Sequence, residues 1–290
     1  MFIIGELINS TRKRIREAVL ARDAGYIREV AIRQQQAGAH MLDVNGGVPG
    51  QELESLTWLV GIVKEVVDLP VCLDSSDPEA IRAALPLVIG RGVMVNSVND
   101  EDGRAQSMLP LLREYHAKVI ALCMGAAGPP TGLEDRLSAG SRLVDRLTAG
   151  GIPLDDIYID PCVLPVSTGG QHGTAVADAI GTLMTRYPGI HSSVGLSNVS
   201  FGLPVRRLLN ESFLLLLMSR GLDAAILDPC DRQLMAGITA AEALLGRDEH
   251  CLKYLRAFRE GKLEAAAPAP AVPAGPLAPP GAQAAGADRP

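Results

Sequence analysis

A repeated alternation of short apolar runs with longer amphipathic stretches constrains this chain more than any other feature of its sequence. About eight strand–helix units of this kind fit into roughly 250 residues, which is the size and rhythm of a TIM (β/α)8 barrel. The apolar runs are almost continuously hydrophobic, as parallel strands are when helices cover the sheet. Strands are predicted at residues 2–4, 41–44, 71–73, 93–95, 119–123, 157–159, 191–196 and 224–227.

Amphipathic segments between these runs predict the helices of an α/β fold. Pro78 opens one of them, and proline is well placed in a first helical turn. An open doubly wound sheet would give a similar alternation, but no Gly-x-Gly-x-x-Gly follows the first strand, which argues against dinucleotide binding. Helices are predicted at about residues 12–37, 51–67, 78 onward, 103–116, 133–148, 174–187, 204–220 and 232–245.

The end of the chain differs in composition from the rest. Proline, alanine and glycine dominate it, and no apolar period survives there. Such a segment cannot bury enough apolar surface to offset the entropy lost on ordering. We therefore predict a barrel over residues 1–262 and a disordered Pro/Ala/Gly-rich tail over residues 263–290.

Charge and aromatic content exclude some classes of partner. The net charge is −6 and aromatic residues make up 3% of the chain, so neither a basic patch nor a stacking platform for nucleic acid is expected. The longest apolar runs are far too short to span a bilayer, and the N-terminus does not resemble a signal peptide. The five cysteines are scattered and form no Cys-x-x-Cys pair, which favours a reducing cytoplasm over a disulfide framework.

Polar side chains recur at the carboxyl ends of the predicted strands. In a TIM barrel these ends surround the active site, so the side chains are expected to form one cup rich in carboxylates and amides. Any single position could instead be a helix cap, as the run of residues 74–77 before Pro78 illustrates. The positions are Glu6, Asn9, Asp43, Asn45, Asp74, Ser75, Asn96, Asn99, Asp160, Ser197, Asn198 and Asp228.

Two kinds of ligand would suit such a cup. Several carboxylates can hold a hard cation, which keeps a metal-dependent aldolase or hydrolase open as a reading. Carboxylates mixed with amides are also suited to the edge of a heterocycle that alternates N–H donors with acceptors, and the cup has no cluster of lysine or arginine for phosphates. No Gly-x-Ser-x-Gly or His-Glu-x-x-His motif is present, and His172 is interpreted as a loop residue.

Six segments in order resemble the methyltetrahydrofolate:corrinoid protein methyltransferases, which share a pterin-binding barrel with dihydropteroate synthase. The resemblance covers about residues 2–258, and it is the ordered set, with each motif at a strand end, that makes it specific. The segments read FIIGELIN, LDVN, CLDSS, VNSVN, YIDP and GLSNVSFG.

The resemblance implies roles for individual residues. Asp74 and Asp160 would hold the pyrimidine edge of the pterin, and Asn96 would also bond to it. Asn198 would lie beside N5 and act in catalysis, with the region of Asp74 as a relay for the proton. The remaining residues implied to line the pterin site are Asp43, Glu6, Asn45 and Ser197.

Two departures from related patterns limit this reading. Dihydropteroate synthase carries Ser-Arg-Lys where this chain has Ser197-Asn198-Val199, which argues against pterin–aminobenzoate condensation. Phe201-Gly202 replaces the more polar residues expected in the methyltransferases. A dihydropteroate synthase-like pterin enzyme and a folate-binding barrel without activity remain the alternatives.

The resemblance also implies the partners of the reaction. Methyltetrahydrofolate or tetrahydrofolate would be a substrate, and cobalamin would be carried by a separate corrinoid protein, because the chain has no Asp-x-His-x-x-Gly signature. That carrier could be a corrinoid iron–sulfur protein or the corrinoid protein of a demethylase, so the direction of transfer stays open. A cytoplasmic homodimer without a bound metal is expected.

Overall fold

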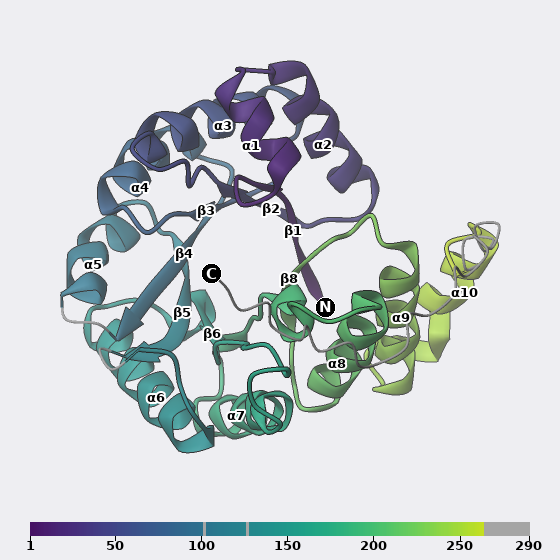
Figure 1. The fold of residues 1–290 in the computed structure, drawn as a ribbon. Helices are drawn as coiled ribbons and strands as arrows, with labels where there is room; N and C mark the ends of the chain where they lie inside the picture. The colour runs from purple at the N-terminus through teal and green to yellow at the C-terminus, as the bar shows by residue number, and fades with distance from the viewer. Residues whose placement is uncertain (101–102, 126–127, 264–290) are drawn as a thin grey trace, which may run out of the picture.

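Eight parallel strands form the centre of the molecule, as Figure 1 shows looking along the barrel. The computed structural model describes residues 1–100, 103–125 and 128–263. The strands follow one another around the sheet in the order β7-β6-β5-β4-β3-β2-β1-β8. Their bounds are β1 Phe2–Asn9, β2 Met41–Asn45, β3 Val71–Asp74, β4 Val93–Asp100, β5 Lys118–Gly125, β6 Ile157–Asp160, β7 His191–Ser192 and β8 Ala224–Leu227.

The sheet closes on itself between β7 and β8. The amide of Ile226 donates to the carbonyl of Val194 at 2.9 Å, and Gly195 forms an isolated parallel bridge with Ile226. Asp223 adds a side-chain contact by accepting from the amide of Ser192 at 2.8 Å. The predicted TIM barrel is therefore confirmed, and an open doubly wound sheet is excluded.

Helices surround this barrel and shield its outer face (Figure 1). Their apolar sides pack on the strands and bury two large clusters that include Ile8, Leu59 and Leu214. The hydrogen bonds of buried parallel strands are thereby kept from water. The helices are α1 Lys13–Leu20, α2 Ala24–Gln36, α3 Glu52–Val66, α4 Pro78–Ala84, α5 Arg104–Glu114, α6 Leu133–Ala149, α7 His172–Arg186, α8 Arg206–Ser219, α9 Arg232–Leu244 and α10 Leu252–Arg259.

Three features of the fold differ from the prediction. The helix expected at residues 12–37 is two helices, because Arg22 adopts a φ of +53° and Asp23 caps α2 by accepting from the amide of Tyr26. The strand expected at residues 191–196 ends at Ser192, and Leu196–Ser200 forms the short 3₁₀ helix η3. Helix α10 was not expected, because no strand precedes it and it buries none of its side chains.

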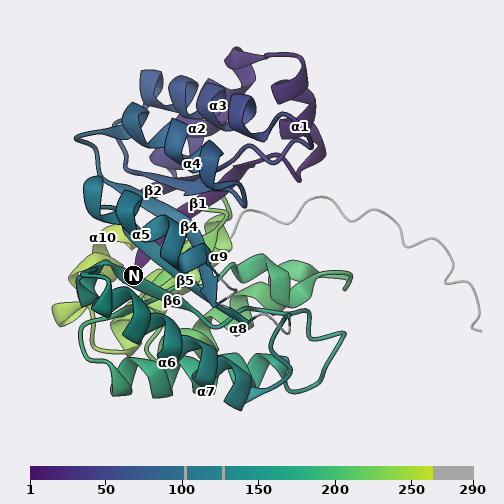
Figure 2. The ribbon, with the colours of Figure 1, turned by 90° about the vertical axis from the view of Figure 1, so that its left-hand side faces the viewer.

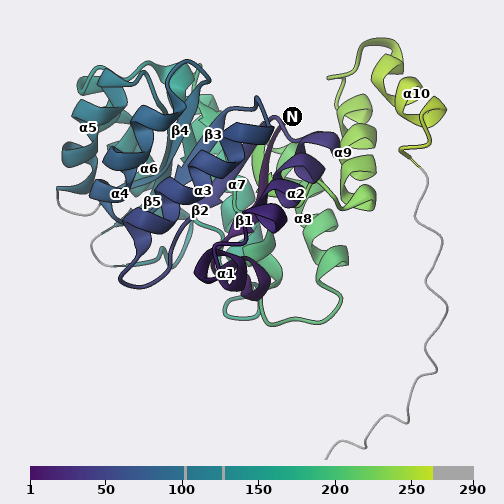
Figure 3. The ribbon, with the colours of Figure 1, turned by 90° about the horizontal axis from the view of Figure 1, so that it is seen from above.

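The two ends of the barrel are distinct. Figures 2 and 3 show α1 and the start of α8 projecting on one side, while the N-terminus and α10 lie toward the other. The projecting side is the one at which the strands end, here called the mouth. The tail expected at residues 263–290 lies outside the described residues except for Leu263.

Candidate active site

A polar cavity of about 380 Å³ opens at the mouth of the barrel. The residues around it come from β1 to β6, from β8, and from the segments that follow β1 and β7. Its lining residues are Glu6, Asn9, Thr11, Arg12, Asp43, Asp74, Asn96, Ser97, Leu122, Asp160, Gly195, Ser197, Asn198 and Ile226.

The floor of the cavity follows from the two-residue repeat of a strand. Side chains two positions apart on a strand point to the same face. If one residue points into the barrel, the residue two positions later therefore also points inward, closer to the mouth. Seven buried or half-buried residues form the inner apolar layer, and each is followed two positions later by a residue of the cavity. These pairs are Ile4 and Glu6, Met41 and Asp43, Cys72 and Asp74, Met94 and Asn96, Ile120 and Leu122, Tyr158 and Asp160, and Ala224 and Ile226.

Around this cavity the structure brings together all of the predicted pterin-site residues except Asn45, which lies behind Asp74 and does not line the cavity. Asn45 donates from Nδ2 to Oδ2 of Asp74 at 3.0 Å and accepts from the amide of Gly47 at its Oδ1. It therefore orients Asp74 rather than lining the cavity. Asn96 is similarly engaged, since its Nδ2 donates to Oδ1 of the buried Asp43 at 3.2 Å.

Asp160 is held by the loop that follows β6. Its Oδ1 accepts from the amide of Cys162 at 2.8 Å, and Cys162 adopts a φ of +59°. The fully buried Arg136 fixes this loop by donating to the carbonyls of Pro161 at 2.8 Å, Cys162 at 3.1 Å and Gly132 at 2.9 Å. The position of Asp160 thus depends on a guanidinium that is not itself in the cavity.

Burial raises the pKa values of the carboxyls in the cavity. Burial raises the pKa of Asp160 to about 6, although the amides of Cys162 and Gly195 oppose the shift. Burial also raises the pKa of Asp74 to about 6, with the charge of Glu52 adding to it and the bond from Asn45 opposing it. For Asp43, burial and the neighbouring charge of Asp74 raise the pKa well above its ordinary value. A ligand that donates N–H bonds here would supply what the ionised carboxylates lack.

Asn198 differs from Asn45 and Asn96 because its side chain forms no hydrogen bond with any described residue. It lies on η3 at the edge of the cavity and is exposed, and no hydrogen bond joins its side chain to any described residue. Its backbone is firmly placed, since Arg206 donates to the carbonyl of Ser197 at 2.6 Å and to Oγ of Ser200 at 3.0 Å. A free amide on a fixed backbone is suited to bond a ligand in the cavity.

Four polar residues at strand ends or in loops do not line the cavity. Ser75 points to the other face of β3 and bonds to Glu52. Asp228 accepts from the amide of Cys230 at 2.8 Å, as a turn residue would. Asn99 is buried elsewhere and His172 begins α7. In the run before Pro78, Asp77 is the helix cap, accepting from the amide of Glu79, whereas Asp74 faces the cavity.

Six residues that line the cavity were not predicted from the sequence: Thr11, Arg12, Ser97, Leu122, Gly195 and Ile226. Leu122 and Ile226 could have been found from the two-residue repeat within their strands. Arg12 could not, because it follows β1 and reaches back to Glu6, which accepts from its Nη2 at 2.5 Å. This guanidinium partly offsets the burial that raises the pKa of Glu6.

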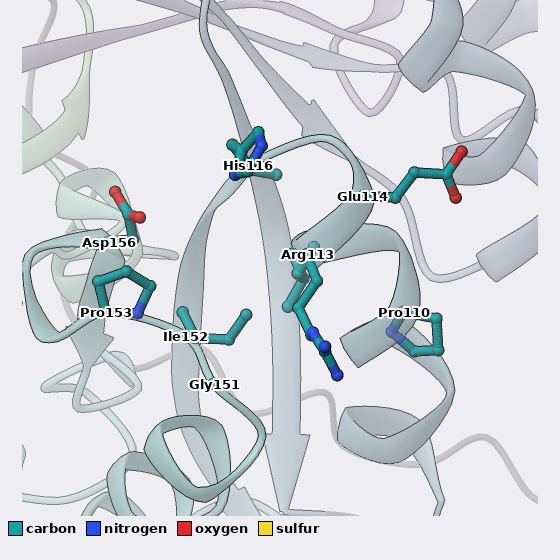
Figure 4. A pocket seen from close by; sticks show the side chains of 10 residues that line it. Pro110, Arg113, Glu114, His116, Gly151, Ile152, Pro153 and Asp156 are labelled. Carbon is teal, nitrogen blue, oxygen red and sulfur yellow. The ribbon is translucent and has the colours of Figure 1, made fainter.

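A larger cavity, of about 630 Å³, lies away from the mouth, near the start of β5. Figure 4 shows that its charged side chains, Arg113, Glu114 and Asp156, point in different directions instead of toward one point. Asp156 already accepts from Lys118 at 3.2 Å. The N-terminal face of a barrel of this kind contributes stability rather than chemistry, so the polar cavity at the mouth is the candidate site.

Neither a cluster of metal ligands nor a membrane-spanning helix occurs among the residues that the structure describes. No group of three or more histidine, cysteine, aspartate or glutamate side chains there is placed to hold a metal ion. Among the same residues, no helix is long and apolar enough to cross a membrane.

Comparison with known sequences identifies similar proteins. The family model described as "Pterin binding enzyme" matches residues 5–228. A methylcorrinoid:tetrahydrofolate methyltransferase from Eubacterium limosum is 40% identical over 266 residues, which make up 91% of this chain and 98% of that protein. The methionine synthase of Mycobacterium leprae (strain TN) is 33% identical over 240 residues, but this match covers 78% of this chain and 20% of that enzyme.

Comparison with solved structures supports the same fold. A dihydropteroate synthase from Coxiella burnetii in complex with pteroic acid aligns with a TM-score of 0.65 and 17% identity, over 85% of this chain and 94% of that one. The dihydropteroate synthase of Xanthomonas albilineans in complex with 7,8-dihydropteroate aligns with a TM-score of 0.62 and 19% identity, over 84% and 93%. At these identities the likeness establishes the barrel and no more.

Proposed function

The chain belongs to the family of pterin binding enzymes, and on this premise we propose that it moves a methyl group between N5 of tetrahydrofolate and the cobalt of a corrinoid protein. The observation that carries the proposal is the uncommitted amide of Asn198 above a floor of carboxylates and amides. The name and 40% identity of the Eubacterium limosum relative support the same activity and favour transfer from the methylated corrinoid to tetrahydrofolate.

The floor of the cavity suits the pyrimidine edge of a pterin. Asp160 and Asp74 are acceptors that burial has left poorly solvated, and a pterin offers adjacent N–H donors at its pyrimidine edge. Asn96 and Asp43 add an amide and a carboxyl beside them. Leu122 and Ile226 would contact the faces of the rings.

Asn198 would act on N5, where charge changes during the reaction. When the methyl group leaves N5 for a cobalt nucleophile, the nitrogen becomes a poor leaving group with growing negative charge, and a hydrogen bond from Nδ2 stabilises it. The same bond lowers the barrier of the reverse reaction. Acceleration requires that this bond be stronger in the transition state than in the ground state.

Transfer to tetrahydrofolate releases a proton from N5 as the N–CH3 bond forms, and the reverse transfer returns one to N5. Another group must exchange this proton, because an amide cannot do so. Asp74 is the carboxyl proposed for this exchange, directly or through water. Burial raises its pKa to about 6, so near neutral pH it is mostly ionised and can take up the proton that N5 releases. Asn45 would keep its carboxyl in one orientation.

Methyl transfer with free methylcobalamin tests the proposed function. The protein, tetrahydrofolate and methylcobalamin are mixed under anaerobic conditions, and the absorbance of cob(I)alamin is followed together with the formation of methyltetrahydrofolate. Equal amounts of the two products are expected. Binding of tetrahydrofolate without any product would instead indicate a folate-binding barrel, and condensation of a dihydropterin diphosphate with aminobenzoate would indicate a dihydropteroate synthase.

We expect the affinity for tetrahydrofolate to fall below pH 6. The ligand needs ionised acceptors, and each carboxyl that must lose a proton weakens binding about tenfold per pH unit below its pKa. Because these pKa values are raised in the empty folded protein, the two carboxyls favour folding below about pH 4 and lose that contribution as the pH rises through about 6. Calorimetry between pH 4.5 and 8 measures the slope.

Asp160→Asn serves as the matched variant for this measurement. It keeps the shape of the side chain but removes its titration, so the slope of log Kd against pH should decrease by about one. Binding at pH 8 should also be weaker, because an amide nitrogen replaces one acceptor. An unchanged slope in Asp160→Asn would remove Asp160 from the ligand contacts.

The partner protein, the compartment and the oligomeric state are proposed on separate grounds. The carrier is a corrinoid protein, and a corrinoid iron–sulfur protein is one form it could take. The cytoplasm is proposed because all five cysteines are unpaired in the described structure. A homodimer is proposed from the resemblance to the methyltransferases.

A further inference from the structure

Three large apolar side chains are exposed beside the mouth. Phe201 is 67% exposed, Val205 73% and Leu208 62%. They follow Asn198 within ten residues, in the turn after η3 and the first turn of α8, and together they are called the apolar rim. Leaving such side chains in water forgoes about 1.5–3 kcal/mol each compared with burying them, so an exposed group of them beside a site points to a partner.

The backbone holds the apolar rim in place. The amide of Phe201 donates to the carbonyl of Asn198 at 3.1 Å, and that of Leu203 to Ser200 at 3.0 Å. Val205, a β-branched residue, adopts a φ of +51° at the start of α8, a conformation that such residues rarely take. Strained residues of this kind cluster where function requires a fixed geometry.

The apolar rim is continuous with the site. Arg206 lies between Val205 and Leu208 and bonds both Ser197 and Ser200, so one side chain ties the rim to the segment that carries Asn198. Any methyl donor or acceptor must reach a pterin nitrogen beside Asn198 from the open side of the cavity. A large group that does so must pass over residues next to Asn198.

We propose that the apolar rim is the surface on which the corrin ring of the partner's cofactor seats during transfer. This inference rests on the proposed function. A corrin is a broad macrocycle with methyl groups along its edge, and it must come face-on to N5, so its edge extends beyond the cavity and meets the rim. The departure at Phe201-Gly202 from more polar residues is then a feature of this contact.

A triple variant tests the proposal with free methylcobalamin as the probe. Phe201→Ser, Val205→Ser and Leu208→Ser together should raise the KM for methylcobalamin roughly tenfold or more and leave the Kd for tetrahydrofolate within about twofold. All three side chains are exposed, so the variant should fold, and its melting curve and circular dichroism spectrum check this.

A matched control is available on the far side of the barrel. Leu244→Ser, Leu252→Ser and Phe258→Ser remove one aromatic and two aliphatic side chains of comparable exposure (87%, 62% and 63%), and Figure 3 shows α9 and α10 away from the mouth side of α1. This control should keep the KM of the unaltered protein.

Four outcomes would overturn the proposal. An unchanged KM in the rim variant excludes the corrin contact, and an equal rise in the control shows that the effect is not specific to the rim. A rim variant that changes only the molar mass in solution, measured by light scattering, makes the rim a contact between copies of the chain. If the unaltered protein transfers no methyl group at all, the proposed function fails, and the rim proposal fails with it.

Discussion

Replacing Asn198 by alanine is expected to slow methyl transfer by a factor of about 10² to 10³. The variant loses one preorganised donor at the atom where charge develops, and the loss of such a donor raises the barrier by about 2.7–4 kcal/mol. The side-chain amide of Asn198 makes no hydrogen bond to any described residue, so its removal should leave the surrounding structure unchanged. Single-turnover measurements with saturating tetrahydrofolate and methylcobalamin give the rate of the transfer step itself.

The affinity for tetrahydrofolate separates a catalytic role of Asn198 from a binding role. Calorimetry should give a Kd within about threefold of the unaltered protein, because the floor of the cavity is intact. Gln35→Ala removes an exposed amide on α2 and serves as the control, with no change in rate expected. Turnover that persists in Asn198→Ala would take this residue out of the mechanism, whereas a large loss of affinity with an unchanged rate would make it a binding residue.

Replacing Arg136 by methionine is expected to lower the free energy of unfolding by about 3 kcal/mol or more. The guanidinium is fully buried and donates to three carbonyls, those of Gly132, Pro161 and Cys162. Methionine fills much of the space but donates nothing, and each buried acceptor left without a partner costs about 1–3 kcal/mol. Urea denaturation followed by circular dichroism measures the change.

Arg28→Met provides the control for this loss of stability. Arg28 bonds to Glu65 at 2.6 Å, and both side chains are about half exposed, so this pair should contribute no more than about 1 kcal/mol. Because Arg136 also fixes the loop that holds Asp160, its variant should bind tetrahydrofolate more weakly at temperatures where it remains folded. Equal stability of the two variants would mean that water replaces the guanidinium.

The carboxyls of the cavity are buried at a cost in stability. Four carboxyls, those of Glu6, Asp43, Asp74 and Asp160, meet in one partly buried cup, and burial raises the pKa of each of them. Amide groups and one guanidinium donate hydrogen bonds to some of these carboxyl oxygens, and a ligand with N–H donors would bond to more of them. Tetrahydrofolate is therefore expected to raise the melting temperature most at neutral pH.

The sequence by itself determined the strands and the residues at their ends. The alternation of apolar runs predicted the positions of all eight strands, and β8 has the predicted bounds. Side chains alternate faces along a strand, so the local sequence alone predicts that Asp43, Asp74 and Asp160 point into the barrel, and their places near the strand ends put them at its mouth. The motif around Asn198 predicted an amide at the mouth, and this residue does line the cavity.

Only the tertiary structure decided which polar groups line the cavity and which groups support them. Asn45 and Asp74 lie 29 residues apart in the sequence and become donor and acceptor when β2 pairs with β3. Arg136 lies on α6 and supports the loop after Asp160, and no pattern in the sequence around Arg136 indicates this role. A polar residue at a strand end looks the same in the sequence whether it caps a helix, orients a neighbouring side chain or lines a cavity. The three roles differ in contacts between segments that only folding brings together.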